Sequence, residues 1–288
     1  MNVGVVSYYV RGSEYEPKTD EHARRLDESR AVVERLLDFL DDRGVDAVVN
    51  EEIAEVLGAE DKGVTLADVE HEADVVVAVG GDGTVLRTVG HMDEPVPLLC
   101  INTGRVGFLS GATPENALQE VGEIIDGYDV ERRERLAVEV NGEALPPALN
   151  ETVIVTSRPA KIMGFDVYHD GELVESIRSD GVVVATPTGS TAYSMSAGGP
   201  LVESCVESRL VVPLAPFRMQ VAPWVLGSDP ATTVVPTRVD KPAKVVVDGD
   251  EHAEVERGDE IEFTRAENDA LFVDTGDTFF EKVREKLY

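Results

Sequence analysis

The sequence predicts an α/β amino-terminal domain with a doubly wound parallel sheet, followed by a β-rich carboxy-terminal domain of β-sandwich type. Two observations support this organisation. Up to about residue 131, short apolar runs alternate with segments of helical periodicity, and beyond it short strand patterns are separated by turn residues. We therefore expect domains at 1–131 and 132–271, with residues 272–288 forming a helix that packs back on the first domain.

The first domain is expected to be Rossmann-like. The apolar periodicity predicts, in order, a strand at 2–10, a helix at 20–43, a strand at 46–49, a short helix at 64–71, a strand that begins at Val75, a strand at 97–101 and a helix opened by Thr113 and Pro114. In such a sheet the ligand site lies beyond the carboxyl ends of the strands.

The second domain has few helical signals. Short strands are expected at 136–140, 152–156, 164–168, 181–185, 243–247 and 260–264. Residues 190–207 are the exception, because their small residues and a Gly-Gly-Pro predict a loop and one helix. An amphipathic helix is expected at 278–288.

The stretch from Val75 to Arg87 reads VVVAVGGDGTVLR, which predicts a buried strand, a tight turn and a helix. The turn glycines carry no Cβ, so their amides can approach an anion at the start of the helix. Thr84 is expected to cap that helix. We assign the phosphate-binding turn to Gly80, Gly81, Gly83 and Thr84.

Asp82 is the unusual residue of this turn. A carboxylate repels phosphate oxygens unless it binds a metal or accepts the proton of the group being phosphorylated, so Asp82 is a candidate base. The alternative is an ordinary βα turn with a solvated Asp82. Two familiar phosphate-binding motifs are excluded: Leu86 stands where a dinucleotide fingerprint needs glycine, and no Gly-Lys-Ser/Thr occurs.

A second group of polar residues follows in the β-rich part. Asn150 and Glu151 precede a predicted strand, and residues 179–200 read SDGVVVATPTGSTAYSMSAGGP. Glu151 suits two adjacent ribose hydroxyls, and Asp180 and Asn150 offer further hydrogen-bonding groups, so together they describe a nucleoside pocket. The composition of 186–193 alone also fits an ordinary turn-rich loop.

The composition narrows the class of protein. The chain has 288 residues, 26 Lys and Arg against 56 Asp and Glu, and a net charge of −30, which argues against a nucleic-acid or anionic-membrane partner. The acidic runs are spread over the predicted surface helices. They fit either ordinary solvated faces or, as the whole-chain excess favours, the surface of a halophilic protein.

Cysteines and histidines give no metal-binding spacing. Cys100 lies in a strand pattern and Cys205 in a helix-like one, so two buried thiols are expected rather than a disulfide. The amino terminus lacks the basic region of a signal peptide, and no apolar run reaches the roughly 20 residues of a membrane helix. We expect a cytoplasmic protein.

Several separated motifs closely resemble those of the NAD kinase family. They are GGDGT at 80–84, INTGRVGFL at 101–109, NE at 150–151, SDG with TPTGSTAYS between 179 and 194, AGGP at 197–200 and FFEKVREKL at 279–287. Lipid kinases and phosphofructokinases share the GGDGT turn, whereas the NE pair and TPTGSTAYS are particular to NAD kinases.

The resemblance implies transfer of the ATP γ-phosphoryl group to the 2′-hydroxyl of the adenosine ribose of NAD⁺, giving NADP⁺, with a divalent cation such as Mg²⁺. Asp82 would be the catalytic proton acceptor. The family pattern places the NAD-binding residues at Asp82, Gly83, Arg87, Asn150, Glu151, Lys161, Arg178, Asp180, Thr191, Ala192, Tyr193, Ser194, Met195, Ser196, Ala215 and Asp250. It also implies a homodimer or homotetramer.

The chain departs from the family pattern at two places. Phe217 stands where the family typically has a histidine, and Asp250 where it tends to have glutamine. Two other functions remain open from the sequence. One is another GGDGT-type kinase, acting on a lipid or sugar alcohol; the other is a non-catalytic NAD-binding sensor, which would not need Asp82.

Overall fold

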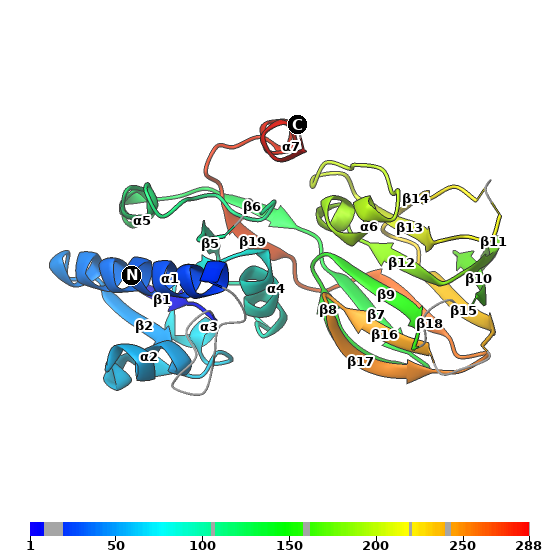
Figure 1. Ribbon diagram of the computed structural model, residues 1–288, viewed down its shortest axis with the longest axis horizontal. Helices are drawn as coiled ribbons and strands as arrows, with labels where there is room; N and C mark the ends of the chain where they lie inside the picture. Colours follow the sequence, from blue (N-terminus) through cyan, green and yellow to red (C-terminus); the bar gives the residue numbers. More distant parts are fainter. Residues whose placement is uncertain (9–19, 105–106, 158–161, 219–220, 240–242, 288) are drawn as a thin grey trace. The chain divides into compact units, whose positions relative to one another are not determined.

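The computed structural model describes residues 1–8, 20–104, 107–157, 162–218, 221–239 and 243–287, with only the backbone for 20–22. The chain divides into two compact units (Figure 1). The first comprises Met1–Arg132 and Ala270–Tyr288, and the second comprises Arg133–Asp269. Each unit is described by itself.

The first unit is built on a seven-stranded sheet in the order β3-β2-β1-β4-β5-β19-β6. Its strands are β1 (Asn2–Val6), β2 (Asp46–Asn50), β3 (Gly63–Val64), β4 (Val75–Gly80), β5 (Leu98–Asn102), β6 (Val130–Arg133) and β19 (Ala270–Val273). The recorded pairings of β1 to β5 and of β19 are parallel, so the predicted α/β class is confirmed. The part of the first predicted strand at 9–10 lies outside the described residues.

The first unit also contains helices. They are α1 (Asp20–Asp42), α2 (Glu51–Leu57), a 3₁₀ turn η1 (Glu60–Lys62), α3 (Val69–Glu72), α4 (Asp82–Gly90), α5 (Ala117–Asp126) and α7 (Phe279–Leu287). The short helix predicted at 64–71 is only partly right, because its start pairs with β2 as strand β3 and only its end is helical. The sequence did not predict α2, whose seven residues are too few for a clear period.

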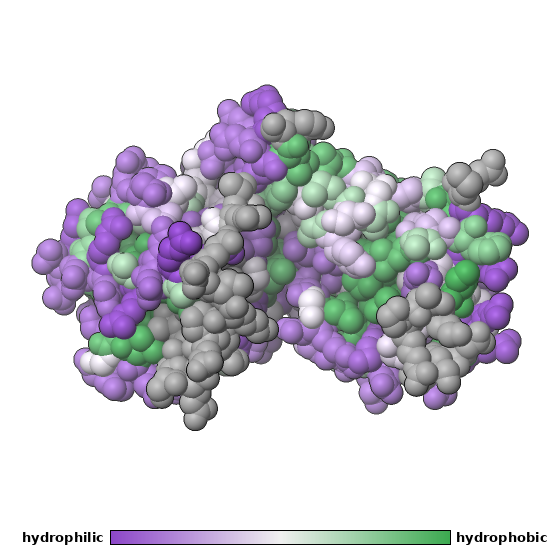
Figure 2. Space-filling model, in the orientation of Figure 1, coloured by the Kyte–Doolittle hydropathy of each residue, from purple (hydrophilic) through white to green (hydrophobic). Residues whose placement is uncertain are grey.

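None of the helices in the described part of the chain is long and apolar enough to cross a membrane. In the face of the molecule shown in Figure 2, hydrophilic side chains cover much of both units, and hydrophobic ones show mainly on the β-rich unit.

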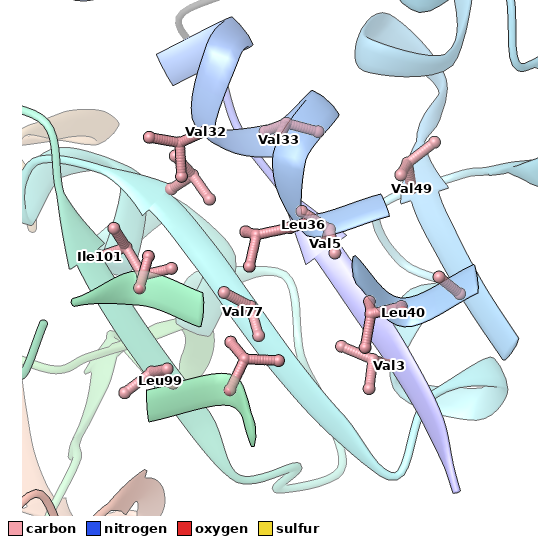
Figure 3. Packing of buried hydrophobic residues seen from close by; sticks show 14 of the residues in the cluster. Val3, Val5, Val32, Val33, Leu36, Leu40, Val49, Val77, Leu99 and Ile101 are labelled. Carbon is pink, nitrogen blue, oxygen red and sulfur yellow. The ribbon is translucent and has the colours of Figure 1, made fainter. Parts of the chain in front are cut away.

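Helix α1 packs its apolar stripe on the sheet (Figure 3). Val33, Leu36 and Leu40 are fully buried against strands β1, β4 and β5. Burying each such side chain contributes about 1.5–3 kcal/mol, so this stripe anchors the strands whose ends carry the site.

The order in which successive strands are added to the sheet reverses between β1 and β4. From β1 the chain adds β2 and β3 on one side, then returns to place β4 on the other side of β1 and continues to β5. The register pairs Val6 with Ala78, so the carboxyl ends of β1 and β4 adjoin. Open parallel sheets bind ligands at such a switch point, and the GGDGT turn follows β4 there.

The second unit has two six-stranded sheets, ordered β11-β10-β15-β18-β7-β8 and β14-β13-β12-β9-β16-β17, with antiparallel pairings. Their strands are β7 (Leu136–Val140), β8 (Glu143–Ala148), β9 (Glu151–Thr156), β10 (Met163–His169), β11 (Glu172–Ser179), β12 (Gly181–Ala185), β13 (Ser208–Leu214), β14 (Trp224–Gly227), β15 (Thr232–Arg238), β16 (Ala243–Val247), β17 (Asp250–Val255) and β18 (Ile261–Arg265).

The strand period explains how this unit is packed. Val182 and Val184 of β12 join a core shared by both sheets, whereas Val183 and Ala185 face a second cluster on the other side of β12. The predicted β-rich sandwich class is therefore confirmed. Proline makes β13 and β15 hard to predict, because Pro213 and Pro236 lie in strands with neighbours on both sides, where proline is rare.

The segment expected to be a loop with one helix contains a 3₁₀ turn, η2 (Thr188–Thr191), and the short helix α6 (Tyr193–Ser196). Both cysteine thiols are unlinked. Cys100 is buried in β5 as expected, but the prediction of a buried Cys205 in a helix is wrong, because this residue lies in an exposed turn.

Candidate active site

Asp82 is held by a loop that follows the neighbouring strand. The residue opens α4 directly after β4, and its carboxylate accepts hydrogen bonds from the amides of Phe108 (2.9 Å) and Leu109 (3.3 Å). A Cβ at Gly107 would lie 1.8 Å from Oδ1 of Asp82, so only glycine lets the loop come this close. A carboxylate has lone pairs beyond these bonds. Asp82 is therefore fixed in direction and still able to accept a proton.

Thr84 has a different role from the predicted one. The N-cap of α4 is Gly81, and no side chain among the described residues caps the helix there. Thr84 is instead buried beneath the turn, where a Cβ at Gly80 would lie 2.1 Å from its Oγ1. The prediction of a threonine cap is wrong, because this side chain packs against the end of β4.

Gly83 is a glycine that the fold itself does not require. It is exposed in the first turn of α4, and a Cβ built on it meets no described atom within 4 Å. Glycine in a helix costs about 1 kcal/mol relative to alanine. The first amides of a helix have no intrahelical acceptor, so a bare Gly83 leaves them open to an anion.

Arg87 lies one turn further along α4. Its guanidinium carbon is 4.2 Å from the centroid of the Tyr8 ring, just beyond the carboxyl end of β1. The contact places a cation across the β1–β4 switch point, next to the phosphate-binding turn.

In the second unit, a carboxylate clamps the bend that carries Asn150 and Glu151. Asp248 accepts hydrogen bonds from the amides of Leu149 (2.6 Å), Asn150 (2.9 Å) and Glu151 (3.0 Å). Asp248 lies in the turn between β16 and β17 with a positive φ of 46°. Its carboxylate therefore sets the direction of the Asn-Glu pair from about a hundred residues away in sequence.

The two side chains of this pair have unused acceptors. Oδ1 of Asn150 and Oε2 of Glu151 are buried and have no hydrogen-bond partner among the described residues. A buried acceptor without a partner costs about 1–3 kcal/mol, so such atoms in native proteins generally serve a ligand or water. Two adjacent acceptors suit two hydroxyl donors.

Burial raises the pKa of Glu151 to about 7, and the negative charge of Asp248 adds to this effect. The amide of Tyr193 donates a hydrogen bond to the Glu151 carboxylate, and this bond by itself lowers the pKa of Glu151. Glu151 therefore changes its charge near neutral pH.

The TPTGS segment packs directly on the Asn-Glu pair. The amide of Thr186 donates to the carbonyl oxygen of Asn150 (2.9 Å), and the Thr186 hydroxyl donates to that of Leu149 (2.6 Å). A Cβ at Gly189 would lie 2.1 Å from the Asn150 carbonyl oxygen. These contacts fix the TPTGS segment (186–190) against the backbone of the Asn-Glu bend.

Residues 191–196 continue from this segment. Ser194 is buried, and a Cβ at Gly199 would lie 2.4 Å from its Oγ. Tyr193 and Ser196 are exposed. Thr191, Ala192 and Met195 are half-buried. The side chains of residues 191–196 thus differ in their exposure, although the sequence analysis predicted that all six bind the ligand.

Asp180 lies at the other end of the same sheet. Ala185 pairs with Glu151 and Gly181 with Val155, so Asp180 lies about 16 Å along the strand from the Glu151 end. Arg178 and Ala215 are at this far end too, since Gly181 pairs with Leu214. The structure therefore does not bring these three residues to the Asn-Glu pair of the same chain.

A cavity of about 480 Å³ lies beside Arg178. Arg218 and Arg238 also line it, and the Arg178 guanidinium carbon lies 4.8 Å from the ring centroid of Phe217. Three arginines at one cavity of a strongly acidic chain favour an anionic group there.

Two further predicted residues remain. Lys161 lies outside the described residues, and Asp250 is exposed at the start of β17. The sequence drew attention to Asp250, whereas Asp248 makes the contacts with the Asn-Glu bend. The sequence also assigned no role to Gly107 and Phe108, although the motif INTGRVGFL contains both.

The GGDGT turn belongs to the first unit, and the Asn-Glu pair belongs to the second. Family models for the N-terminal and C-terminal domains of ATP-NAD kinases match residues 22–128 and 149–275. The NAD kinase of Methanothermobacter thermautotrophicus is 42% identical over 268 residues, covering 91% of this chain and 94% of the relative. That of Methanospirillum hungatei is 43% identical over 218 residues, covering 76% and 81%.

Two solved structures resemble this chain. An NAD kinase from Archaeoglobus fulgidus in complex with ATP is 32% identical, with a TM-score of 0.77 over 99% of both chains. A yeast NADH kinase complexed with NADH has a TM-score of 0.85, covering 99% of this chain and 87% of that one, and at 23% identity it shows a shared fold.

Proposed function

This chain belongs to the NAD kinase family, and we propose that it transfers the γ-phosphoryl group of ATP to the 2′-hydroxyl of the adenosine ribose of NAD⁺, giving NADP⁺ and ADP. The observation that carries this proposal is the pair of buried acceptors on Asn150 and Glu151, for which the described part of the chain supplies no hydrogen-bond partner. A ribose offers two neighbouring hydroxyl donors, which match these two acceptors.

Asp82 is the proton acceptor in this proposal. The 2′-oxygen forms a bond to the γ-phosphorus, its proton passes to the Asp82 carboxylate, and the electron pair of the broken phosphorus–oxygen bond stays on ADP. The hydrogen bonds from Phe108 and Leu109 hold the carboxylate in place for this step. Gly83 and the first amides of α4 bind phosphate oxygens.

The divalent cation is brought by ATP. No group of three acidic, histidine or cysteine side chains able to hold a metal occurs in the described parts of the chain. Asp82 is a single carboxylate beside the phosphate-binding turn, and this suits Mg²⁺ carried mainly by substrate phosphates. When bound, the ion neutralises charge on the β- and γ-phosphates.

The enzyme acts as a homodimer or homotetramer. Arg178, Asp180 and Ala215 lie too far along the sheet to reach a ribose held by Glu151 of the same chain, so a second copy is the natural place for their action. Phe217 and Val225, which are 61% and 49% exposed, supply apolar surface in the same unit. Light scattering that shows a fully active monomer would overturn this.

The test is an assay of NADP⁺ formation with an NADP⁺-specific dehydrogenase. We expect one ADP per NADP⁺ with Mg²⁺ and ATP, and no product in excess EDTA, with the thermal midpoint unchanged by EDTA. Parallel assays test the phosphoryl donor by replacing ATP with polyphosphate or other nucleotides. Others test the acceptor by replacing NAD⁺ with NADH, a lipid alcohol or a sugar alcohol. Turnover of only a lipid or sugar alcohol, or NAD⁺ binding without turnover, would replace this proposal by the other kinase or by the sensor.

A further inference from the structure

The loop that fixes Asp82 also contacts the carboxy-terminal helix. The Phe108 amide donates to Oδ2 of Asp82, and the centroid of the Phe108 ring lies 5.3 Å from Nζ of Lys286 on α7. One residue therefore touches both the candidate base and a lysine 204 positions later in the chain. All three residues belong to the first unit.

The start of α7 is tied down by local contacts. Thr278 and Glu281 form a capping box, in which the amide and hydroxyl of Thr278 donate to Glu281 (3.0 and 2.8 Å) and the Glu281 amide donates to the Thr278 hydroxyl (3.3 Å). Before the helix, a Cβ at Gly111 would lie 2.7 Å from Cγ2 of Thr275, so this segment packs closely on the end of the Asp82 loop. These contacts fix where α7 begins and how the segment before it meets the loop.

Lys286 is a half-buried cation close to Asp82. Burial and the positive charge of Lys282 lower the pKa of Lys286, and the negative charges of Asp82, Asp277 and Glu285 act in the opposite direction. Charges that are partly removed from water interact more strongly than charges at the surface. The negative charge of Asp82 is thus one of those that favour the charged form of Lys286.

We propose that Lys286 is a positioning residue for phosphoryl transfer: from α7, across Phe108, its ammonium balances the charge of the Asp82 carboxylate while the donor phosphates occupy the adjacent turn. Without such a cation, the carboxylate and the phosphates repel one another and the base is pushed from its line toward the hydroxyl. This inference rests on the proposed role of Asp82 as proton acceptor.

The experiment compares four single variants and one double variant of the full-length protein. Lys286→Met keeps the length and the apolar stem that covers Phe108 but removes the charge, and Lys286→Arg restores the charge. Arg284→Gln is the matched control, since it removes one positive charge from an exposed position of the same helix. Asp82→Asn, alone and combined with Lys286→Met, tests whether the lysine acts through the aspartate.

We expect Lys286→Met to lower kcat about tenfold, which corresponds to about 1.4 kcal/mol, with KM for NAD⁺ and the thermal midpoint nearly unchanged. Lys286→Arg should recover most of the rate, and Arg284→Gln should match the wild type. In the Asp82→Asn background, Lys286→Met should cost less than twofold.

Three results would overturn the inference. They are a kcat of Lys286→Met within twofold of wild type, a failure of Lys286→Arg to recover the rate lost in Lys286→Met, and an equal loss from Lys286→Met with and without Asp82. The single Asp82→Asn variant tests whether Asp82 is the proton acceptor, so its kcat distinguishes an error in that role from an error in the role of Lys286. A wild-type protein that makes no NADP⁺ would instead refute the proposed function.

Discussion

At the scale of single residues, the site depends on a few side chains whose directions are set by distant backbone amides. Asp82 takes its amides from the loop after β5, and Asn150 and Glu151 keep acceptors free because Asp248 binds the amides of their bend. The proposed roles of proton acceptor and ribose-binding group thus fall on two different carboxylates, Asp82 and Glu151.

Substituting Asp82→Asn removes the base and keeps the size and hydrogen-bonding capacity of the side chain. A positioned base contributes a factor of about 10² to 10⁴, so we expect kcat to fall by about 10² or more. NAD⁺ binding, measured by calorimetry, should survive because Asn150 and Glu151 are intact. A near-normal kcat would show that Asp82 is not the base, and loss of binding for both substrates would show that it mainly shapes the turn. As a control, Glu151→Gln should act chiefly on KM for NAD⁺.

Substituting Gly83→Ala separates the fold from ligand binding. The added methyl group meets no described atom, and alanine favours the helix by about 1 kcal/mol, so the thermal midpoint should stay equal or rise. If phosphates approach this turn, KM for ATP should rise about tenfold or more. Gly90→Ala is the matched control on the same helix, because its Cβ also meets open space. Unchanged ATP kinetics in Gly83→Ala would place the phosphates elsewhere.

The raised pKa of Glu151 predicts pH dependence. In the folded apo protein this pKa is about 7, above the ordinary value of 4.5, so the folded state binds more protons between these values. The penalty for ionising Glu151 is absent below about pH 4.5, and stability is lost as the pH rises through 7. Glu151→Gln should therefore raise the thermal midpoint at pH 8 but not at pH 5. Equal midpoint differences at both pH values would contradict a buried carboxyl.

At the scale of secondary-structure elements, one hairpin turn supports the pocket. The turn between β16 and β17 carries Asp248, which accepts hydrogen bonds from three amides at the start of β9, and the exposed Asp250 follows as the first residue of β17. The hairpin thus holds the end of a neighbouring strand that pairs with β16.

These two aspartates form a matched pair for a test. Asp248→Ala leaves three amides without their acceptor, and we expect a loss of about 3 kcal/mol of unfolding free energy together with weaker NAD⁺ binding. Asp250→Ala should change stability by about 0.5 kcal/mol or less, as exposed substitutions do. Urea denaturation of both variants measures this. Similar losses of unfolding free energy in Asp248→Ala and Asp250→Ala would mean that the hydrogen bonds to Asp248 do not stabilise the fold.

At the scale of the whole molecule, the excess of acidic residues is the main influence on how stability depends on salt. A net charge of −30 on 288 residues makes like charges repel one another around each folded unit, and this opposes folding at low salt. The hydrophilic surface visible on both units in Figure 2 is consistent with many of these groups facing solvent.

Stability should therefore rise with potassium chloride. The screening length falls from about 10 Å at 0.1 M to about 3 Å at 1 M, so the thermal midpoint should climb steeply at low salt and then more slowly. A midpoint that stays flat or falls up to molar salt would remove the case for a halophilic protein.

The sequence by itself determined the fold class and the strand, turn and helix around GGDGT, because both are written in neighbouring residues whose periodicity or lack of Cβ has a local meaning. Only the tertiary structure decided that Thr84 packs rather than caps, that Asp248 rather than Asp250 holds the Asn-Glu bend, and that Asp180 lies at the far end of β12. These facts depend on pairing between distant segments, such as the 97 positions that separate Asp248 from Glu151, and local patterns carry no record of strand register.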